Sequence, residues 1–96
     1  MTSTFQSIHN HHMDGVFATV MELSPQYPAM VADPDLLADV ACVALNNLPP
    51  RYIRHAIDLS FYMTEKEREK SEIAIQTAVK NAFDFVQARM ARRARA

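Results

Sequence analysis

Glycine occurs only once in this chain of 96 residues, at Gly15. A fold with many tight turns generally needs several glycines, because glycine adopts positive φ angles at little cost. Residues that favour helices, such as alanine, leucine, methionine, glutamate and arginine, are abundant instead. The sequence therefore predicts a mainly α-helical fold and argues against a β-sandwich or a β-barrel.

Length and apolar content predict a single domain spanning residues 1–96. Hydrophobic residues make up 49% of the chain, which suffices for one core. A chain of this size buries only somewhat over ~60% of the surface of its unfolded form, so a second core is not expected. No run approaches the ~18 apolar residues of a membrane span. Residues 1–8 lack the basic start and apolar run of a signal peptide, so we expect a cytoplasmic protein that does not enter a membrane.

Helical spacing predicts three principal helices. The first periodic segment covers about residues 5–23. The second helix begins at the N-cap Asp33 and ends before Pro49-Pro50, because proline cannot continue a helix. The third begins at Thr64, which forms a capping box with Glu67. The expected apolar stripes are Met13, Val16, Phe17 and Val20 in the first helix; Leu37, Val40, Ala41, Ala44, Leu45 and Leu48 in the second; and Ile75, Val79, Ala82, Phe83, Val86 and Met90 in the third.

A short extended segment is expected after the Pro-Pro turn. Apolar and more polar residues alternate from Ile57 to Thr64, which is typical of a strand. No partner strand is evident, so we expect either pairing with a second copy about a two-fold axis or an extended connector. A third helix reaching Arg92 would span ~40 Å, more than the ~26 Å diameter expected for a compact domain of this length. Both features favour a two-fold homodimer.

Motifs for catalysis and metal binding are missing from the sequence. It has neither a Gly-x-Ser-x-Gly element nor a glycine loop for phosphate, so we expect no enzyme and no cofactor. His9 and His12 at i, i+3, with Asp14 nearby, are able to reach one ion. A structural zinc site needs four ligands, however, so exposed polar histidines are the simpler interpretation. The single cysteine, Cys42, is expected to be a semi-buried packing residue.

Side chains suited to ligand binding are concentrated after the two prolines. They are Arg51, Tyr52, Arg54, His55 and Asp58. Arginine presents a planar fork to phosphate or to guanine, tyrosine offers a stacking face, and aspartate accepts from the N–H groups of a base. These residues suit a small nucleotide ligand. The alternative is architectural, with Tyr52 and Ile53 in the core and Arg54 paired with Asp58 at the surface.

Positive charge also collects at the C-terminus, in Arg89, Arg92, Arg93 and Arg95, although the formal net charge is −1. Cations at that end of a helix favour its dipole, and the segment has no interleaved aromatic residues on which bases stack. We therefore do not expect nucleic acid as a partner.

Residues 39–52, Asp-Val-Ala-Cys-Val-Ala-Leu-Asn-Asn-Leu-Pro-Pro-Arg-Tyr, resemble the signature of the ComFB (late competence development protein) family. Residues 73–82 are similar to the closing helix of that family. The resemblance implies a small bacterial cytoplasmic protein, mostly helical and often dimeric. Some members, notably in cyanobacteria, act as receptors for cyclic dinucleotides such as cyclic di-GMP. Other members bind zinc through a cysteine cluster, but residues 27–35 here contain no cysteine, so the zinc site does not carry over.

Four residues occupy signature positions of the family: Asp39, Asn46, Arg51 and Tyr52. Our leading hypothesis is a dimeric signalling module that binds a cyclic dinucleotide and passes the signal to a protein partner. Arg51 and Arg54 would hold phosphates, Tyr52 would stack, and Asp58 or Asp39 would read a base edge. Two alternatives remain: a structural signature, in which Asn46 caps the helix and Tyr52 pins the turn, and a ligand-free protein–protein adaptor.

Overall fold

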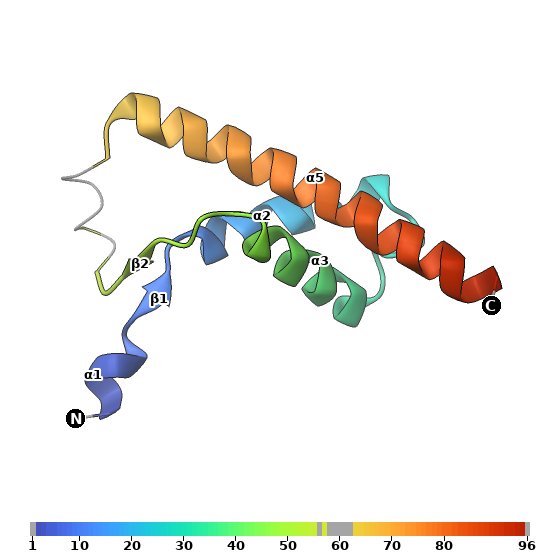
Figure 1. Ribbon diagram of the computed structural model, residues 1–96, viewed down its shortest axis with the longest axis horizontal. Coiled ribbons are helices and arrows are strands. Elements are labelled where there is room, and N and C mark those ends of the chain that lie inside the picture. The colour runs from blue at the N-terminus through green and yellow to red at the C-terminus, as the bar shows by residue number, and fades with distance from the viewer. Residues whose placement is uncertain (1, 56, 58–62, 96) are drawn as a thin grey trace.

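The computed structural model describes residues 2–55, 57 and 63–95 and is mainly helical (Figure 1). Three principal helices make up most of the described residues, as the sequence predicts. The order along the chain is α1 (Thr2–Gln6), β1 (His9–Asn10), α2 (His12–Leu23), the 3-10 turn η1 (Ser24–Gln26), α3 (Pro34–Asn46), β2 (Tyr52–Ile53) and α5 (Glu65–Arg95). Among the described residues, no helix is long and apolar enough to cross a membrane.

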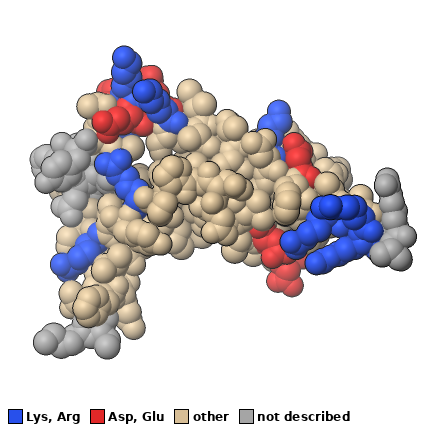
Figure 2. Space-filling view, viewed as in Figure 1, with Lys and Arg blue, Asp and Glu red and all other residues tan. Residues whose placement is uncertain are grey.

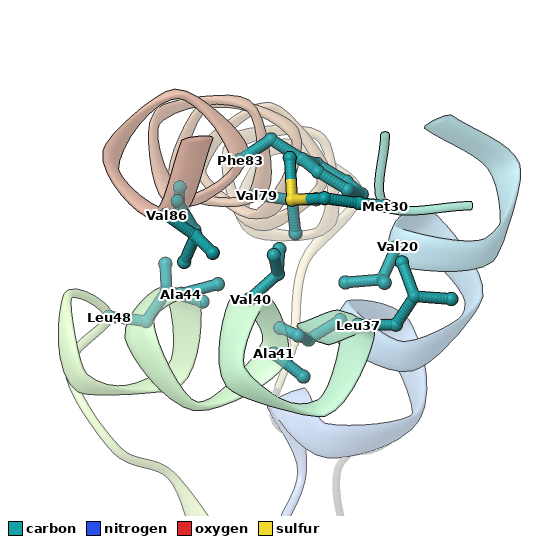
Figure 3. Packing of buried hydrophobic residues seen from close by; sticks show 13 residues of the cluster. Val20, Met30, Leu37, Val40, Ala41, Ala44, Leu48, Val79, Phe83 and Val86 are labelled. Carbon is teal, nitrogen blue, oxygen red and sulfur yellow. The ribbon is translucent and has the colours of Figure 1, made fainter. Parts of the chain in front are cut away.

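The core lies where α5 crosses α2 and α3 (Figure 3). Val86 of α5 points toward the apolar stripe of α3, and Phe83 extends toward Met30 in the loop between α2 and α3. Most of the expected stripe residues are buried, but Phe17 is 43% exposed, so its placement in the core is wrong. The buried apolar residues are Val16, Val20, Met30, Leu37, Val40, Ala41, Ala44, Leu48, Ala78, Val79, Ala82, Phe83 and Val86.

Local capping signals determine where two helices begin. Asp33 Oδ1 accepts from the backbone N–H groups of Asp35 at 3.1 Å and Leu36 at 3.2 Å, which fixes the start of α3. Thr64 Oγ1 accepts from the backbone N–H of Glu67 at 3.2 Å, just before α5 begins. Both predicted caps are confirmed.

The first periodic segment is not one helix, and the reason is a tertiary contact at Asn10. The carboxamide Oδ1 of Asn10 accepts from the backbone N–H of His12 at 3.1 Å and from that of Arg51 at 3.2 Å. β1 also pairs antiparallel with β2, with Asn10 opposite Tyr52. These bonds hold residues 9 and 10 extended, so α2 begins only at His12.

The extended segment after the prolines lies earlier than predicted. β2 covers Tyr52–Ile53 and pairs with β1 of the same chain. Ile57 has helical backbone, so the alternation does not start a strand there, and residues 58–62 lie outside the described residues. β2 has an intrachain partner and so gives no support to the expected homodimer, while the unpaired strand predicted from Ile57 onward falls mostly outside the described residues.

The loop between α2 and α3 packs through aromatic and apolar contacts. The ring of Tyr27 stacks on Phe83 with centroids 4.2 Å apart, and its hydroxyl donates to Asp84 Oδ1 at 3.4 Å. Met30 is fully buried beside them. Burial, and then the adjacent Asp84 carboxylate, raise the pKa of Tyr27 above its ordinary value. Side-chain packing therefore holds this loop in place on α5.

Helix α5 has 31 residues, which corresponds to ~46 Å at 1.5 Å per residue. It runs along the longest dimension of the molecule, which measures 49 Å, and extends beyond α2 and α3 at both ends (Figure 1). The predicted overhang is confirmed. Figure 2 shows charged side chains gathered toward the two ends of α5, with a largely uncharged surface between them.

Candidate functional site

The segment Leu48–Pro50, which leads from α3 toward β2, is the centre of the candidate site. Among the residues that the structure describes, three hollows border this segment, and Leu48 lines all of them. Pro49 and Pro50 are exposed, and their rings restrict the backbone between the hollows. Volumes of about 860, 550 and 350 Å³ fall in the range of roughly 300–1,000 Å³ that is typical of ligand pockets.

The smallest hollow, which we call the cationic hollow, collects polar side chains from α2, α5 and the loop. It is lined by His12, Arg51, Lys70, Ser71 and Glu67, with apolar residues between them. Glu67 is the one acidic side chain among the described residues that line it. The Nδ1 atom of His12 is buried and has no hydrogen-bond partner among the described residues. An anion in this hollow would meet Arg and Lys cations and further polar groups.

The backbone of Arg51 is fixed at both ends of the residue. Its N–H donates to Asn10 Oδ1 at 3.2 Å, and its carbonyl accepts from the N–H of His11 at 2.7 Å. The side chain itself is exposed. Burial lowers the pKa of His11, and the nearby His12 and Arg51 act in the same direction. Because the two backbone hydrogen bonds fix the main chain of Arg51, its exposed guanidinium projects from a rigid part of the loop.

The second hollow, the tyrosine hollow, lies on the β-ribbon side of the loop. It is lined by His9, Asn10, Asn46, Pro50 and Tyr52, among others. Tyr52 is 67% exposed, which contradicts the alternative that places this ring in the core, whereas Ile53 is half-buried. Tyr52 is therefore available to stack on a flat ligand.

The largest hollow, the amide groove, runs between the end of α3 and the middle of α5. Asn46, Asn47, Thr77, Asn81 and Phe85 contribute its polar and aromatic lining. Asn47 rather than Asn46 caps α3, because Asn47 Nδ2 donates to the carbonyl of Val43 at 2.9 Å. The Asn46 side chain has no hydrogen bond with any described residue. Capping therefore does not account for Asn46.

The other predicted site residues lie apart from these hollows or have other contacts. Arg54 is exposed, and its Nε donates to Ser7 Oγ at 3.2 Å, tying β2 to the segment after α1. His55 is exposed, and Asp39 lies on the exposed face of α3 without lining any of the hollows described above. Asp58 lies outside the described residues. The structure thus brings Asn46 and Tyr52 together in the tyrosine hollow, whereas Arg51 lines the adjoining cationic hollow.

Sequence reasoning missed the residues that α2 and α5 contribute. The sequence favours His12 only as a possible metal ligand, and no sequence motif draws attention to Lys70. The signal for the amide groove was present but weak: Thr77, Asn81 and Phe85 recur every fourth residue and therefore share one helix face.

The described residues offer no group of three or more His, Cys, Asp or Glu side chains that is able to hold a metal ion. His9 is exposed, and its Nδ1 lies 3.2 Å from the carbonyl oxygen of Ser7. Cys42 is exposed, so the expected semi-buried position is wrong. It lines an apolar groove between α2 and α3 together with Phe17 and Met21, whose side chains are also exposed.

The fold and the site define a class: a small helical domain with ligand-sized hollows around a diproline loop. The family model described as late competence development protein ComFB matches residues 9–90, which include every described residue lining these hollows except Ile8 of the tyrosine hollow. The chain belongs to the ComFB family, and this membership indicates a small competence-related protein. No curated protein and no solved structure gives a significant match.

Proposed function

We propose that this protein is a cytoplasmic, non-catalytic receptor for a cyclic dinucleotide, with cyclic di-GMP favoured, and that it relays the signal to a protein partner. The observation that carries the proposal is the convergence of Arg51, Lys70 and His12 on the cationic hollow. This hollow lies directly beside the loop that carries the family signature.

The chemistry of the ligand matches the surroundings of the loop. Each phosphodiester of a cyclic dinucleotide carries a negative charge, which arginine binds through two parallel N–H groups and lysine binds as a point charge. The bases need flat apolar surfaces, and the exposed ring of Tyr52 provides one in the adjoining tyrosine hollow. Phosphate in the cationic hollow and a base on Tyr52 would place the ligand across Pro50, which lines both hollows.

We also propose that the receptor is a two-fold dimer formed through the groove between α2 and α3. All described residues lining this groove of about 440 Å³ are apolar. Phe17 and Met21 are exposed beside it, so one face offers both projecting side chains and a depression. A second copy presents the same combination, as a two-fold interface requires.

Thermal unfolding with cyclic di-GMP, cyclic di-AMP or no ligand tests the receptor function. A ligand that binds only the folded state stabilises it by about 2.7 kcal/mol at 100 times its dissociation constant. For a domain of this size, that corresponds to a shift in Tm of roughly 10–20 °C. A shift with one nucleotide supports the receptor and identifies its ligand, whereas no shift with either nucleotide refutes it.

The second candidate function is a ligand-free protein–protein adaptor. The exposed, charged first turns of α5, including Glu65, Lys66 and Arg68, favour it because they extend beyond the core. A partner that co-purifies equally from extract with and without cyclic dinucleotides supports the adaptor. A partner whose binding depends on added cyclic dinucleotide supports the receptor.

A further inference from the structure

The amide groove has an arrangement of side chains that the phosphate chemistry of Arg51 does not use. Thr77, Asn81 and Phe85 follow at i, i+4 and i+8 on α5, so they form one row along the groove. Asn46 and Asn47 stand opposite, at the end of α3. All described residues that line this groove are uncharged. We therefore expect this groove to bind an uncharged part of a ligand.

The carboxamides of the groove retain hydrogen-bonding capacity. Asn47 uses its Nδ2 on the Val43 carbonyl, which leaves Oδ1 as an acceptor. Asn46 and Asn81 make no side-chain hydrogen bond with any described residue, so each retains both a donor and an acceptor for a ligand. Such paired donors and acceptors match the edge of a purine base, which presents both kinds of group side by side.

Phe85 supplies the flat surface that a base needs. Its side chain is 49% exposed, although its neighbours Phe83 and Val86 on α5 are buried. The ring lies four residues from Asn81, on the same face of the helix. An aromatic face next to a carboxamide allows stacking and edge recognition of one base together.

The amide groove is also continuous with the cationic hollow. Leu48, Pro49 and Ala74 line both. A nucleotide with its phosphate at Arg51 and Lys70 is therefore able to extend along Pro49 into the groove. A charged partner segment would fit this uncharged lining less well, since its charges would be desolvated without partners.

We propose that the amide groove is a purine-base subsite, in which Phe85 stacks on the base while Asn81 and Asn46 hydrogen-bond its edge. This inference rests on the proposed receptor function and identifies where one base of the ligand binds. Because a carboxamide offers both a donor and an acceptor, the subsite takes guanine or adenine.

The test compares the dissociation constant for cyclic di-GMP, measured by calorimetry, in wild type and variants. Phe85→Leu and Asn81→Leu each weaken binding at least about fivefold, because stacking on one aromatic ring contributes ~1–3 kcal/mol and the loss of a hydrogen-bond partner costs ~1–3 kcal/mol. Phe85→Tyr, which keeps the ring, binds as wild type. Phe5→Leu repeats the first change and Gln76→Leu replaces a comparable carboxamide, both at exposed positions that do not line this groove, and they leave binding unchanged.

A spectroscopic readout tests stacking directly. The chain contains no tryptophan, so Phe85→Trp introduces a single indole. Cyclic di-GMP quenches its fluorescence saturably when guanine stacks on it, and the Phe5→Trp control shows no saturable quenching. If wild type binds but the Phe85 and Asn81 variants bind equally well and quenching is absent, the base subsite is refuted while the receptor stands. If wild type binds neither cyclic di-GMP nor cyclic di-AMP, both proposals fail.

Discussion

The backbone N–H of Arg51 donates to the carboxamide oxygen of Asn10 at 3.2 Å, across 41 positions of sequence. The same oxygen accepts from the N–H of His12 at 3.1 Å. One side chain therefore ends the β1 segment, starts α2 and positions the loop that carries the candidate site. No other single residue in the described part of the chain connects these elements by side-chain hydrogen bonds.

Asn10→Ala is expected to destabilise the fold, because it leaves the N–H groups of His12 and Arg51 without this acceptor. Loss of a hydrogen-bond partner costs ~1–3 kcal/mol, which corresponds to a fall in Tm of roughly 4–24 °C for a domain of this size. Asn10→Asp keeps the acceptor and should retain most of the stability. Thermal unfolding by circular dichroism measures both, and equal Tm values for the two variants would show that the acceptor is not important.

Arg51→Ala is expected to weaken binding of cyclic di-GMP about 10- to 150-fold, the equivalent of the ~1.5–3 kcal/mol of a charged hydrogen bond. Lys70→Ala should act in the same direction, because Lys70 lines the same hollow. Arg54→Ala should have a smaller effect, since Arg54 Nε already donates to Ser7. Calorimetric titration measures these constants.

The matched control for the charge is Arg92→Ala, at an exposed position on α5 outside the matched family region and the hollows. It should bind cyclic di-GMP as wild type does. Unchanged binding in a chain carrying both Arg51→Ala and Arg54→Ala would place the ligand elsewhere on the protein.

His11 should make the stability of the fold depend on pH. Its pKa lies below the ordinary value of 6.5, because of burial first and then of His12 and Arg51. The unfolded chain therefore binds more protons as pH falls through about 6.5, and the folded state loses stability toward acid. Urea unfolding at about pH 7.5 and pH 5.5 should show a smaller loss in His11→Gln than in wild type. His55→Gln, at an exposed position, should lose as much as wild type; an identical loss in all three chains would contradict the assignment.

Gly15 of α2 and Ile75 of α5 lie in close contact, and they should be energetically coupled. A Cβ added at Gly15 would meet Ile75 Cδ1 at 3.0 Å. Alanine favours a helix by ~1 kcal/mol over glycine, but here the contact opposes that gain. In an Ile75→Val background, which removes Cδ1, Gly15→Ala should stabilise by about 1 kcal/mol. The same change in wild type should stabilise less, and a double-mutant cycle from urea unfolding measures the difference.

Local chemistry made much of the fold predictable. Asp33 and Thr64 mark the starts of α3 and α5 through bonds to residues two or three positions away, so the sequence alone locates them. The break near Asn10 was not predictable in this way. It depends on Arg51, which is remote in sequence, and periodicity alone continues the helix through residues 5–23.

In the candidate site, too, the sequence identified residues that are close together in the chain but not those that tertiary packing brings together. Asn46, Arg51 and Tyr52 belong to one contiguous segment, so their types and spacing were enough to identify them. His12 and Lys70 enter the cationic hollow only because α2 and α5 pack beside the loop. Phe17 shows the converse: helical spacing places it in a stripe, but the packing of α2 against α3 and α5 leaves it exposed.

Met21→Asp is expected to prevent dimer formation if two copies associate through the groove between α2 and α3. Met21 is 62% exposed in the single chain, so the carboxylate costs the isolated fold little. In a two-fold contact it would be buried on both copies without a partner, which is strongly unfavourable. Sedimentation should therefore give a dimer for wild type and a monomer for Met21→Asp. Ile73→Asp introduces the same charge at a comparably exposed site on α5 outside the groove, and it should remain dimeric. A wild-type monomer at high concentration, or dissociation by both variants alike, would rule out this groove as the interface.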